Sequence, residues 1–216
     1  NGRPINKNAL IALISTIILE EHPQTTIVTD SVTSNGLASF IKAKGGIHHR
    51  FKRGYKNVIN EAIRLNEEGR ESHLAIETSG HAAIKENYFL DDGAYLISKI
   101  LVKAAQLYRE SQDIGKLIGD LDEALEDKEV RLKIEDKDFR AYANNIINSL
   151  SEKVKTIDGW TQVSENYEGI RVDCRDEKGW FLMRSSLHEP LLVINFESDI
   201  RGGCDMIYER LSALIK

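Results

Sequence analysis

Short apolar segments alternate with helical segments through the first half of the chain, and this order restricts its fold more than any other feature of the sequence. The segment at 25–29, Thr-Thr-Ile-Val-Thr, is β-branched, which is typical of a buried strand. A second strand is expected at 73–76. Strands that alternate with helices form a mostly parallel sheet with helices on both faces. We therefore expect an α/β fold, a three-layer domain with helices over residues 7–20, 37–42, 57–66 and 91–110.

The pattern of the sequence changes after Glu110. Val130, Leu132 and Ile134 alternate with charged residues, which indicates a strand with one buried face, as in antiparallel sheets. The same alternation recurs at 170–174, and further strands are expected at 180–183 and 191–196, before an amphipathic helix at 205–215. We expect three regions: the α/β domain at 1–112, a linker at 113–128, and a smaller α+β domain with an antiparallel sheet at 129–216.

Composition excludes several classes of function. The formal net charge of −5 leaves no basic surface suited to nucleic acid, so an anionic ligand would be held by a few placed cations. No apolar run is long enough to predict a membrane span. The two cysteines, Cys174 and Cys204, have no metal or redox spacing, and so few cysteines are typical of a cytoplasmic protein. The sequence contains no P-loop, dinucleotide fingerprint or serine-hydrolase elbow.

The segment 77–81, Glu-Thr-Ser-Gly-His, follows the second predicted strand. In extended backbone Glu77 and Ser79 face the same way, so a carboxylate and a hydroxyl could bind neighbouring hydroxyls of a ligand. Gly80 lets the backbone turn or approach the ligand, and His81 can titrate near neutral pH. The alternative is a polar turn in which Glu77 caps the next element.

The segment 184–190, Arg-Ser-Ser-Leu-His-Glu-Pro, lies between two predicted strands. The Arg184 guanidinium is a forked donor that matches phosphate oxygens, and two hydroxyls, an imidazole and turn amides could complete an anion site. The alternative is a solvated turn in which Arg184 pairs with Glu189.

A basic segment at 51–56, Phe-Lys-Arg-Gly-Tyr-Lys, precedes a predicted helix and could meet a phosphate or a sugar ring; the alternative is a solvated loop. No metal site is expected in this chain. His48 and His49 are adjacent and point to opposite faces of a strand. Asp91 and Asp92 could bind magnesium, but the start of a helix already accounts for two acidic residues.

In this order, these segments resemble motifs of the α-D-phosphohexomutase superfamily, which includes phosphoglucomutases and phosphomannomutases. Residues 77–81 are similar to its sugar-binding signature G-E-x-S-G-H, with Ile76 in place of the first glycine, and 91–93 match its D-D-G. Residues 51–55 resemble its aromatic-K-x-G-H segment, with Tyr55 where histidine is often found. Residues 184–190 resemble its phosphate loop R-x-S-x-T-E-P, and 193–198 the strand that follows.

The resemblance covers the third and fourth of the family's four domains, an α/β/α domain and a TBP-like C-terminal domain. The family's phosphoserine loop T-A-S-H-x-P and magnesium loop D-G-D-x-D-R do not occur in this sequence. The chain also starts without a methionine, at Asn1. We therefore expect the carboxy-terminal portion of a longer enzyme, whose amino-terminal domains would hold the Mg²⁺ and the phosphoserine.

The resemblance implies a hexose-phosphate mutase, an isomerase that interconverts glucose or mannose 1- and 6-phosphates through a hexose 1,6-bisphosphate. Its sugar-binding residues here would be Glu77, Ser79, Lys52 and Arg53, with His81 as a proton-transfer group. Its phosphate-binding residues would be Arg184, Ser185, Ser186 and His188. Without the phosphoserine half, the chain alone should be inactive.

Three departures from the family pattern bear on the phosphate loop. Leu187 and His188 stand where glycine and threonine are common, and Val193 replaces a downstream arginine, which removes one forked donor. The alternative to a mutase portion is a non-catalytic module that binds sugar phosphates or serves as a scaffold.

Overall fold

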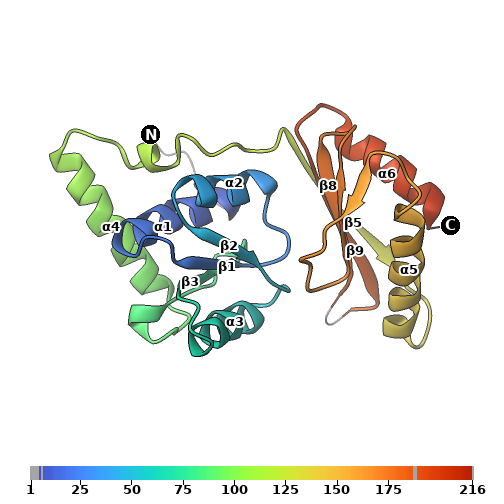
Figure 1. Cartoon of the computed structure of the whole chain (residues 1–216), viewed down its shortest axis with the longest axis horizontal. Helices are drawn as coiled ribbons and strands as arrows, with labels where there is room; N and C mark the ends of the chain where they lie inside the picture. Colours follow the sequence, from blue (N-terminus) through green and yellow to red (C-terminus); the bar gives the residue numbers. More distant parts are fainter. Residues whose placement is uncertain (1–4, 6, 187–188, 216) are drawn as a thin grey trace. The chain divides into compact units, whose positions relative to one another are not determined.

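The structure is a computed structural model that describes residues 5, 7–186 and 189–215. The chain divides into two compact units, 1–123 and 124–216 (Figure 1). The first unit contains α1 (Lys7–Glu21), β1 (Thr26–Thr29), α2 (Asn35–Ala43), β2 (Ile47–Arg50), α3 (Tyr55–Glu67), β3 (Ser72–Ile76), β4 (Ala82–Ile84), the short 3₁₀ helix η1 (Lys85–Asn87), α4 (Gly93–Arg109) and the short 3₁₀ helix η2 (Ile114–Ile118). The second contains β5 (Glu126–Lys133), α5 (Phe139–Val154), β6 (Trp160–Gln162), β7 (Ile170–Cys174), β8 (Gly179–Ser185), β9 (Leu191–Ser198) and α6 (Gly203–Leu214).

The sheet of the first unit has the strand order β2-β1-β3-β4. Strand β1 pairs in parallel with β2 on one side and with β3 on the other, while β4 runs antiparallel to β3. In this register Val28 lies opposite both His49 and Ala75. The predicted mostly parallel sheet is thus confirmed, and β4 is the added antiparallel strand.

Helices cover both faces of this sheet because alternate residues of β1 point to opposite sides. Ile27 packs with apolar residues of α1 and α2 in one cluster, which Leu96 of α4 joins. Val28 packs on the other side with Val58 and Leu65 of α3. The predicted three-layer arrangement is therefore present.

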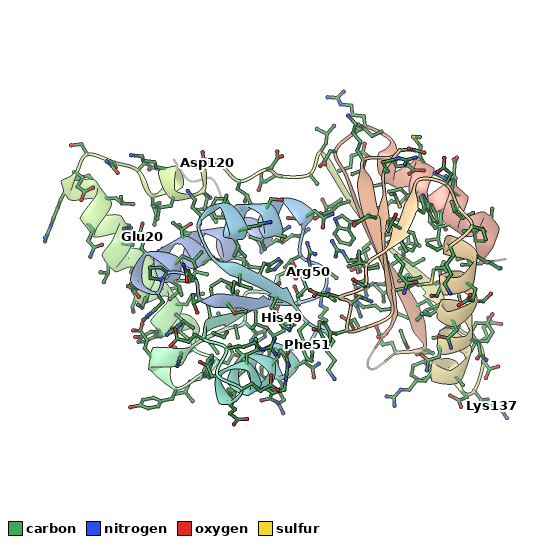
Figure 2. The ribbon with its side chains drawn as sticks, viewed as in Figure 1. Glu20, His49, Arg50, Phe51, Asp120 and Lys137 are labelled. Atoms are coloured by element: carbon green, nitrogen blue, oxygen red, sulfur yellow. The ribbon has the colours of Figure 1, made fainter. Side chains whose placement is uncertain are left out.

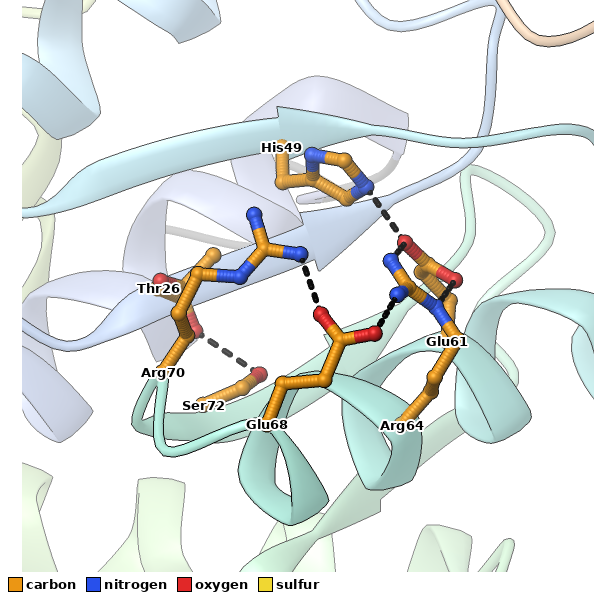
Figure 3. A network of polar contacts seen from close by, with 7 residues as sticks. All are labelled: Thr26, His49, Glu61, Arg64, Glu68, Arg70 and Ser72. Carbon is orange, nitrogen blue, oxygen red and sulfur yellow. Dashed lines mark hydrogen bonds and ion pairs between the residues drawn. The ribbon is translucent and has the colours of Figure 1, made fainter.

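A polar network fixes α3 to β2 (Figure 3). His49 Nε2 lies 2.9 Å from Glu61 Oε1, and Arg64 Nε donates to Glu61 Oε2 over 2.8 Å. The Arg64 hydrogen bonds hold the pKa of Glu61 below its usual range. His48, on the opposite face of the strand, is instead bonded to Thr29 (2.7 Å), so the two adjacent histidines have separate partners, as their alternation predicts.

The second unit is a five-stranded sheet in the order β5-β9-β8-β7-β6, with antiparallel pairing throughout. Helices α5 and α6 lie on one face of it (Figure 1). Phe181, Phe196 and Met183 point from the sheet into the core that these helices close. The predicted α+β unit with an antiparallel sheet is confirmed. Helix α5 was not anticipated from the sequence, and its buried face consists of Ala143, Ile147, Leu150 and Val154.

The segment expected to be a linker, 113–128, is largely built into the two units. Helix η2 packs on α1, where Thr16 Oγ1 donates to the Leu117 carbonyl over 3.4 Å. Strand β5 begins at Glu126, whose carboxylate accepts the Gly202 amide proton over 2.7 Å. The contacts divide the chain between Glu123 and Ala124, so the first unit extends past the expected end at 112.

No helix in the described part of the chain combines the length and the apolar character that a transmembrane span needs.

Replacing Phe181 by alanine should test the core of the second unit. The ring is fully buried and lies 5.2 Å from the Trp160 ring, centroid to centroid, so we expect a loss of about 3–5 kcal/mol in the free energy of unfolding. Both tryptophans of the chain, Trp160 and Trp180, lie in this unit, so urea unfolding followed by tryptophan fluorescence reports on it. Tyr142→Ala, at a residue 46% exposed, should change stability by no more than about 0.5 kcal/mol. An equal loss of unfolding free energy in the two variants would contradict the burial of Phe181 in this core.

Candidate functional site

Three chain segments meet at one edge of the first sheet because β1, β2 and β3 are parallel and end in register. Thr29 pairs with Arg50 on one side and with Ile76 on the other. The segments that follow these residues therefore start side by side, at the carboxyl edge where open α/β sheets bind ligands. Figure 2 labels His49, Arg50 and Phe51 along the end of β2. Arg50 reaches back to the segment after β1, where its Nη2 donates to the Ser34 carbonyl over 2.7 Å.

The Glu77 carboxylate joins two of the predicted segments. Glu77 is 5% exposed; its Oε1 accepts the Gly54 amide proton over 2.7 Å and its Oε2 accepts the Ser79 hydroxyl over 3.2 Å. Gly54 has φ +112°, a conformation that side chains other than glycine rarely adopt. The basic segment before α3 and the segment after β3 are thus one cluster. We call the group Asp30, Arg53, Gly54, Glu77, Ser79 and His81 the edge cluster.

A tight turn presents Ser79 and His81 at the surface. The Glu77 amide donates to the His81 carbonyl and the Gly80 amide donates to the Glu77 carbonyl, each over 2.9 Å. Gly80 has φ +97°, so the turn requires glycine at this position. Glu77 is buried while Ser79 and His81 are exposed, so a ligand could reach the hydroxyl and the imidazole.

The imidazole of His81 is held by Asp91. His81 Nδ1 lies 2.7 Å from Asp91 Oδ2, and Asp91 Oδ1 accepts the Ala82 amide proton over 3.2 Å. The Tyr55 ring stacks on the imidazole with centroids 5.0 Å apart. This arrangement fixes the ring and leaves Nε2 as the nitrogen not engaged by Asp91. The role of Asp91 was missed in the sequence because it is a tertiary contact, whereas its neighbour Asp92 caps α4 as expected.

The two basic residues predicted to bind sugar occupy different surroundings. The Lys52 ammonium lies 5.6 Å from the Phe51 ring centroid and is exposed. Arg53 Nε lies 3.8 Å from Oδ2 of Asp30, a fully buried carboxylate directly after β1. Asp30 was not among the predicted site residues, although the polar segment that it begins was expected at this edge.

The predicted phosphate loop connects β8 and β9 in the second unit. The Ser186 amide donates to the Leu191 carbonyl over 2.9 Å, and the Ser186 hydroxyl accepts the Glu189 amide proton over 3.3 Å. Ser185 Oγ donates to the Ser186 carbonyl over 3.3 Å. Arg184 alternates with the core residues of β8 and so points to the sheet face opposite the helices. His188 and its neighbour Leu187 lie outside the described residues.

Among the described residues, no group of three or more His, Cys, Asp and Glu side chains could hold a metal ion. A surface pocket on α5 and α6, lined by Tyr142, Ile146, Lys153 and Leu214 among others, includes none of the predicted site residues.

Hydrogen exchange should reveal the link between Glu77 and Gly54. The Gly54 amide should exchange slowly, and Glu77→Ala should speed its exchange by about tenfold or more because the acceptor is lost. Glu77→Gln keeps an oxygen acceptor and should retain most of the protection. The Phe51 amide, which donates to the Thr29 carbonyl over 2.8 Å, is the internal control and should not change. An unaltered Gly54 rate in Glu77→Ala would contradict the link.

Comparison with known proteins gives a consistent result over the whole chain. Residues 6–123 match the family model for the α/β/α domain III of phosphoglucomutase/phosphomannomutase. The chain is 26% identical to a phosphoglucomutase of Neisseria gonorrhoeae over 217 aligned positions, which cover 100% of the chain and 44% of that protein. It is 28% identical to a phosphomannomutase/phosphoglucomutase of Pseudomonas aeruginosa, with 95% of the chain and 41% of that protein covered. The chain thus spans less than half the length of these curated relatives.

Solved structures give the same fold. A crystal structure of a phosphoglucomutase/phosphomannomutase family protein from Burkholderia thailandensis matches with a TM-score of 0.78 and 26% identity, covering 100% of this chain and 42% of that one. An N-acetylphosphoglucosamine mutase from Aspergillus fumigatus, solved with GlcNAc-6P and magnesium, matches in fold with a TM-score of 0.62 at 13% identity, covering 99% and 44%. The expected resemblance is confirmed, and the chain belongs to the phosphoglucomutase/phosphomannomutase family.

Proposed function

We propose that this chain is the substrate-recognising, carboxy-terminal portion of a phosphohexomutase that interconverts hexose 1-phosphates and hexose 6-phosphates. The observation that carries the proposal is the edge cluster, in which the buried Glu77 carboxylate accepts the hydroxyl proton of the exposed Ser79 and Asp91 holds the exposed His81. Family membership and the names of the relatives support a mutase as the parent protein.

The edge cluster suits the hydroxyl groups of a sugar ring. Each carboxylate oxygen has two lone pairs, so Glu77 can accept sugar hydroxyls in addition to its bonds with Gly54 and Ser79. The Ser79 hydroxyl can both donate and accept, and Lys52 and Arg53 add donors beside it. Since glucose and mannose share most of their hydroxyls, these contacts serve either sugar.

The β8–β9 loop is the proposed phosphate site. Arg184 supplies the guanidinium, Ser185 and Ser186 supply hydroxyls at the end of β8, and His188 would add an imidazole. Val193, which pairs with Arg184 across the sheet, brings no second guanidinium to this site. We therefore expect phosphate binding to depend strongly on Arg184.

His81 is the proposed proton-transfer group. Asp91 holds Nδ1, so a sugar hydroxyl that approaches Nε2 meets an oriented imidazole that can take or return a proton. Holding the sugar ring at the edge cluster would raise the effective concentration of its reacting hydroxyl for phosphoryl transfer.

The transfer itself belongs to the proposed parent enzyme. A phosphoserine would give its phosphoryl group to the hexose phosphate, form a hexose 1,6-bisphosphate and recover the other phosphate after the sugar reorients. Magnesium, when bound, would neutralise charge on the transferred group. The proposal places the ligands of the ion in the amino-terminal domains of the parent, where the family has its magnesium loop. Hexose phosphates are metabolites of the cytoplasm, which is the proposed location.

Nuclear magnetic resonance of the 216-residue chain tests the two sites separately. Glucose 1-phosphate should shift the amide signals of both Ser79 and Ser186, whereas inorganic phosphate should shift Ser186 alone. Arg184→Ala should abolish the Ser186 shift because the guanidinium provides the charge for the phosphate. Arg175→Ala removes an exposed arginine from the other end of the same sheet and should leave the shift unchanged. No response of the wild-type chain at millimolar sugar phosphate would contradict the proposal.

A coupled assay tests whether mutase turnover requires the rest of the parent enzyme in addition to this chain. The 216-residue chain should show no mutase turnover with magnesium and glucose 1,6-bisphosphate, because it has no phosphoserine loop. The full-length parent should turn over a hexose 1-phosphate under the same conditions. A parent that binds sugar phosphate without turnover would instead indicate a non-catalytic binding module.

A further inference from the structure

Asp30 is a buried acidic residue that none of the proposed steps uses. It follows β1 directly and is 0% exposed. Its Oδ2 accepts the Thr78 hydroxyl over 2.8 Å and lies 3.8 Å from Arg53 Nε. Its Oδ1 is buried and has no hydrogen-bond partner among the described residues.

Keeping this carboxylate inside the protein is costly. Burial raises the pKa of Asp30 to about 6, although the Thr78 hydroxyl and the Arg53 charge act in the opposite direction. The charge of Glu77 adds to the increase. A neutral side chain of similar size would avoid this cost, and strain or buried charge of this kind is concentrated at functional sites.

The position of Asp30 shows what it could do there. Glu77 links Gly54 to Ser79, and Asp30 makes a second link between the same two segments, through Arg53 and Thr78. The residues that the two carboxylates bind are neighbours in the sequence, since Arg53 precedes Gly54 and Thr78 precedes Ser79. The two buried carboxylates are therefore neighbours within the edge cluster: Glu77 fixes Gly54 and Ser79, and Asp30 fixes the adjacent Arg53 and Thr78.

We propose that Asp30 is a positioning residue of the edge cluster, which draws Arg53 and the Thr78–Ser79 turn onto the end of β1 and so sets the site for the sugar. The inference deepens the proposed function and rests on it for the identity of the ligand. Asp30 acts through Thr78 and Arg53 and does not itself touch the sugar.

Protonation of Asp30 should release these contacts. Two charged groups face it, Arg53 from the segment before α3 and Glu77 from the segment after β3. As the pH falls through about 6, Asp30 becomes neutral and its attraction for Arg53 is lost.

The raised pKa of Asp30 also makes the stability of the fold depend on pH. The folded state holds this proton more tightly than the unfolded state, so the stability that the proton confers is lost as the pH rises from about 4 through about 6. At neutral pH ionised Asp30 thus costs stability.

The test uses Asp30→Asn in the 216-residue chain. In the ligand-free wild type, the amide shifts of Thr78 and Ser79 should pass through an inflection near pH 6, and in Asp30→Asn this inflection should be absent. The comparison of the two proteins removes the contribution of every other titrating group. At about pH 8 the variant should bind glucose 1-phosphate about tenfold more weakly, while its urea midpoint stays at or above that of the wild type. A residue with only a structural role would lower the midpoint instead.

Two variants of Thr78 keep the proposal testable if Asp30→Asn does not fold. Thr78→Val removes the hydroxyl that lowers the Asp30 pKa, so the inflection should move to higher pH. Thr78→Ser keeps a hydroxyl and should restore the wild-type curve. An inflection that is absent from the wild type, or unchanged in both Asp30→Asn and Thr78→Val, overturns the inference. These curves need no ligand, so they decide the role of Asp30 even if glucose 1-phosphate fails to bind and the proposed function is lost.

Discussion

The carboxylate of Glu77 accepts hydrogen bonds from two segments that come from different strands, and the edge cluster depends on this one group. Its bond to the Gly54 amide fixes the start of α3 against the segment after β3, and its bond to the Ser79 hydroxyl orients the exposed side of the turn. Both segments need a glycine at a positive φ, at Gly54 and at Gly80. Asp30 also binds these two segments, so two buried carboxylates hold the exposed residues of the edge cluster in place. Hydrogen bonds to these buried carboxylates are stronger than they would be in water, so they hold the segments firmly in place.

The sequence predicts best the helices and strands whose own residues show, by their apolar character, that they are buried. The β-branched run in β1 and the apolar spacing of α1 identify a buried strand and a core helix without tertiary information. Helix α5 has a local signal that the prediction missed, because its buried residues Ala143, Ile147, Leu150 and Val154 recur at helical spacing. Strand β4 has three residues, too few for any periodicity.

The candidate site divides in the same way. Glu77, Ser79 and Arg184 could be proposed as site residues because each lies in a short motif, and the parallel sheet explains why the segments after β2 and β3 meet. The contacts that complete the cluster join residues distant in the chain, as in the pair of His81 with Asp91 and that of Arg53 with Asp30. A single sequence carries no signal for such pairs. The aromatic residue at position 55, which departs from the family pattern, stacks on His81 in the structure and so has a physical role of its own.

The central claim is that a sugar ring binds at the edge cluster of the first unit. Intermolecular nuclear Overhauser effects between the ring protons of glucose 1-phosphate and the 216-residue chain test it most directly, because they locate the ring without assuming a mechanism. We predict contacts from the ring protons to Ser79 and His81. Contacts confined to other residues, such as Tyr142 and Ile146 of the pocket on α5, would contradict the account.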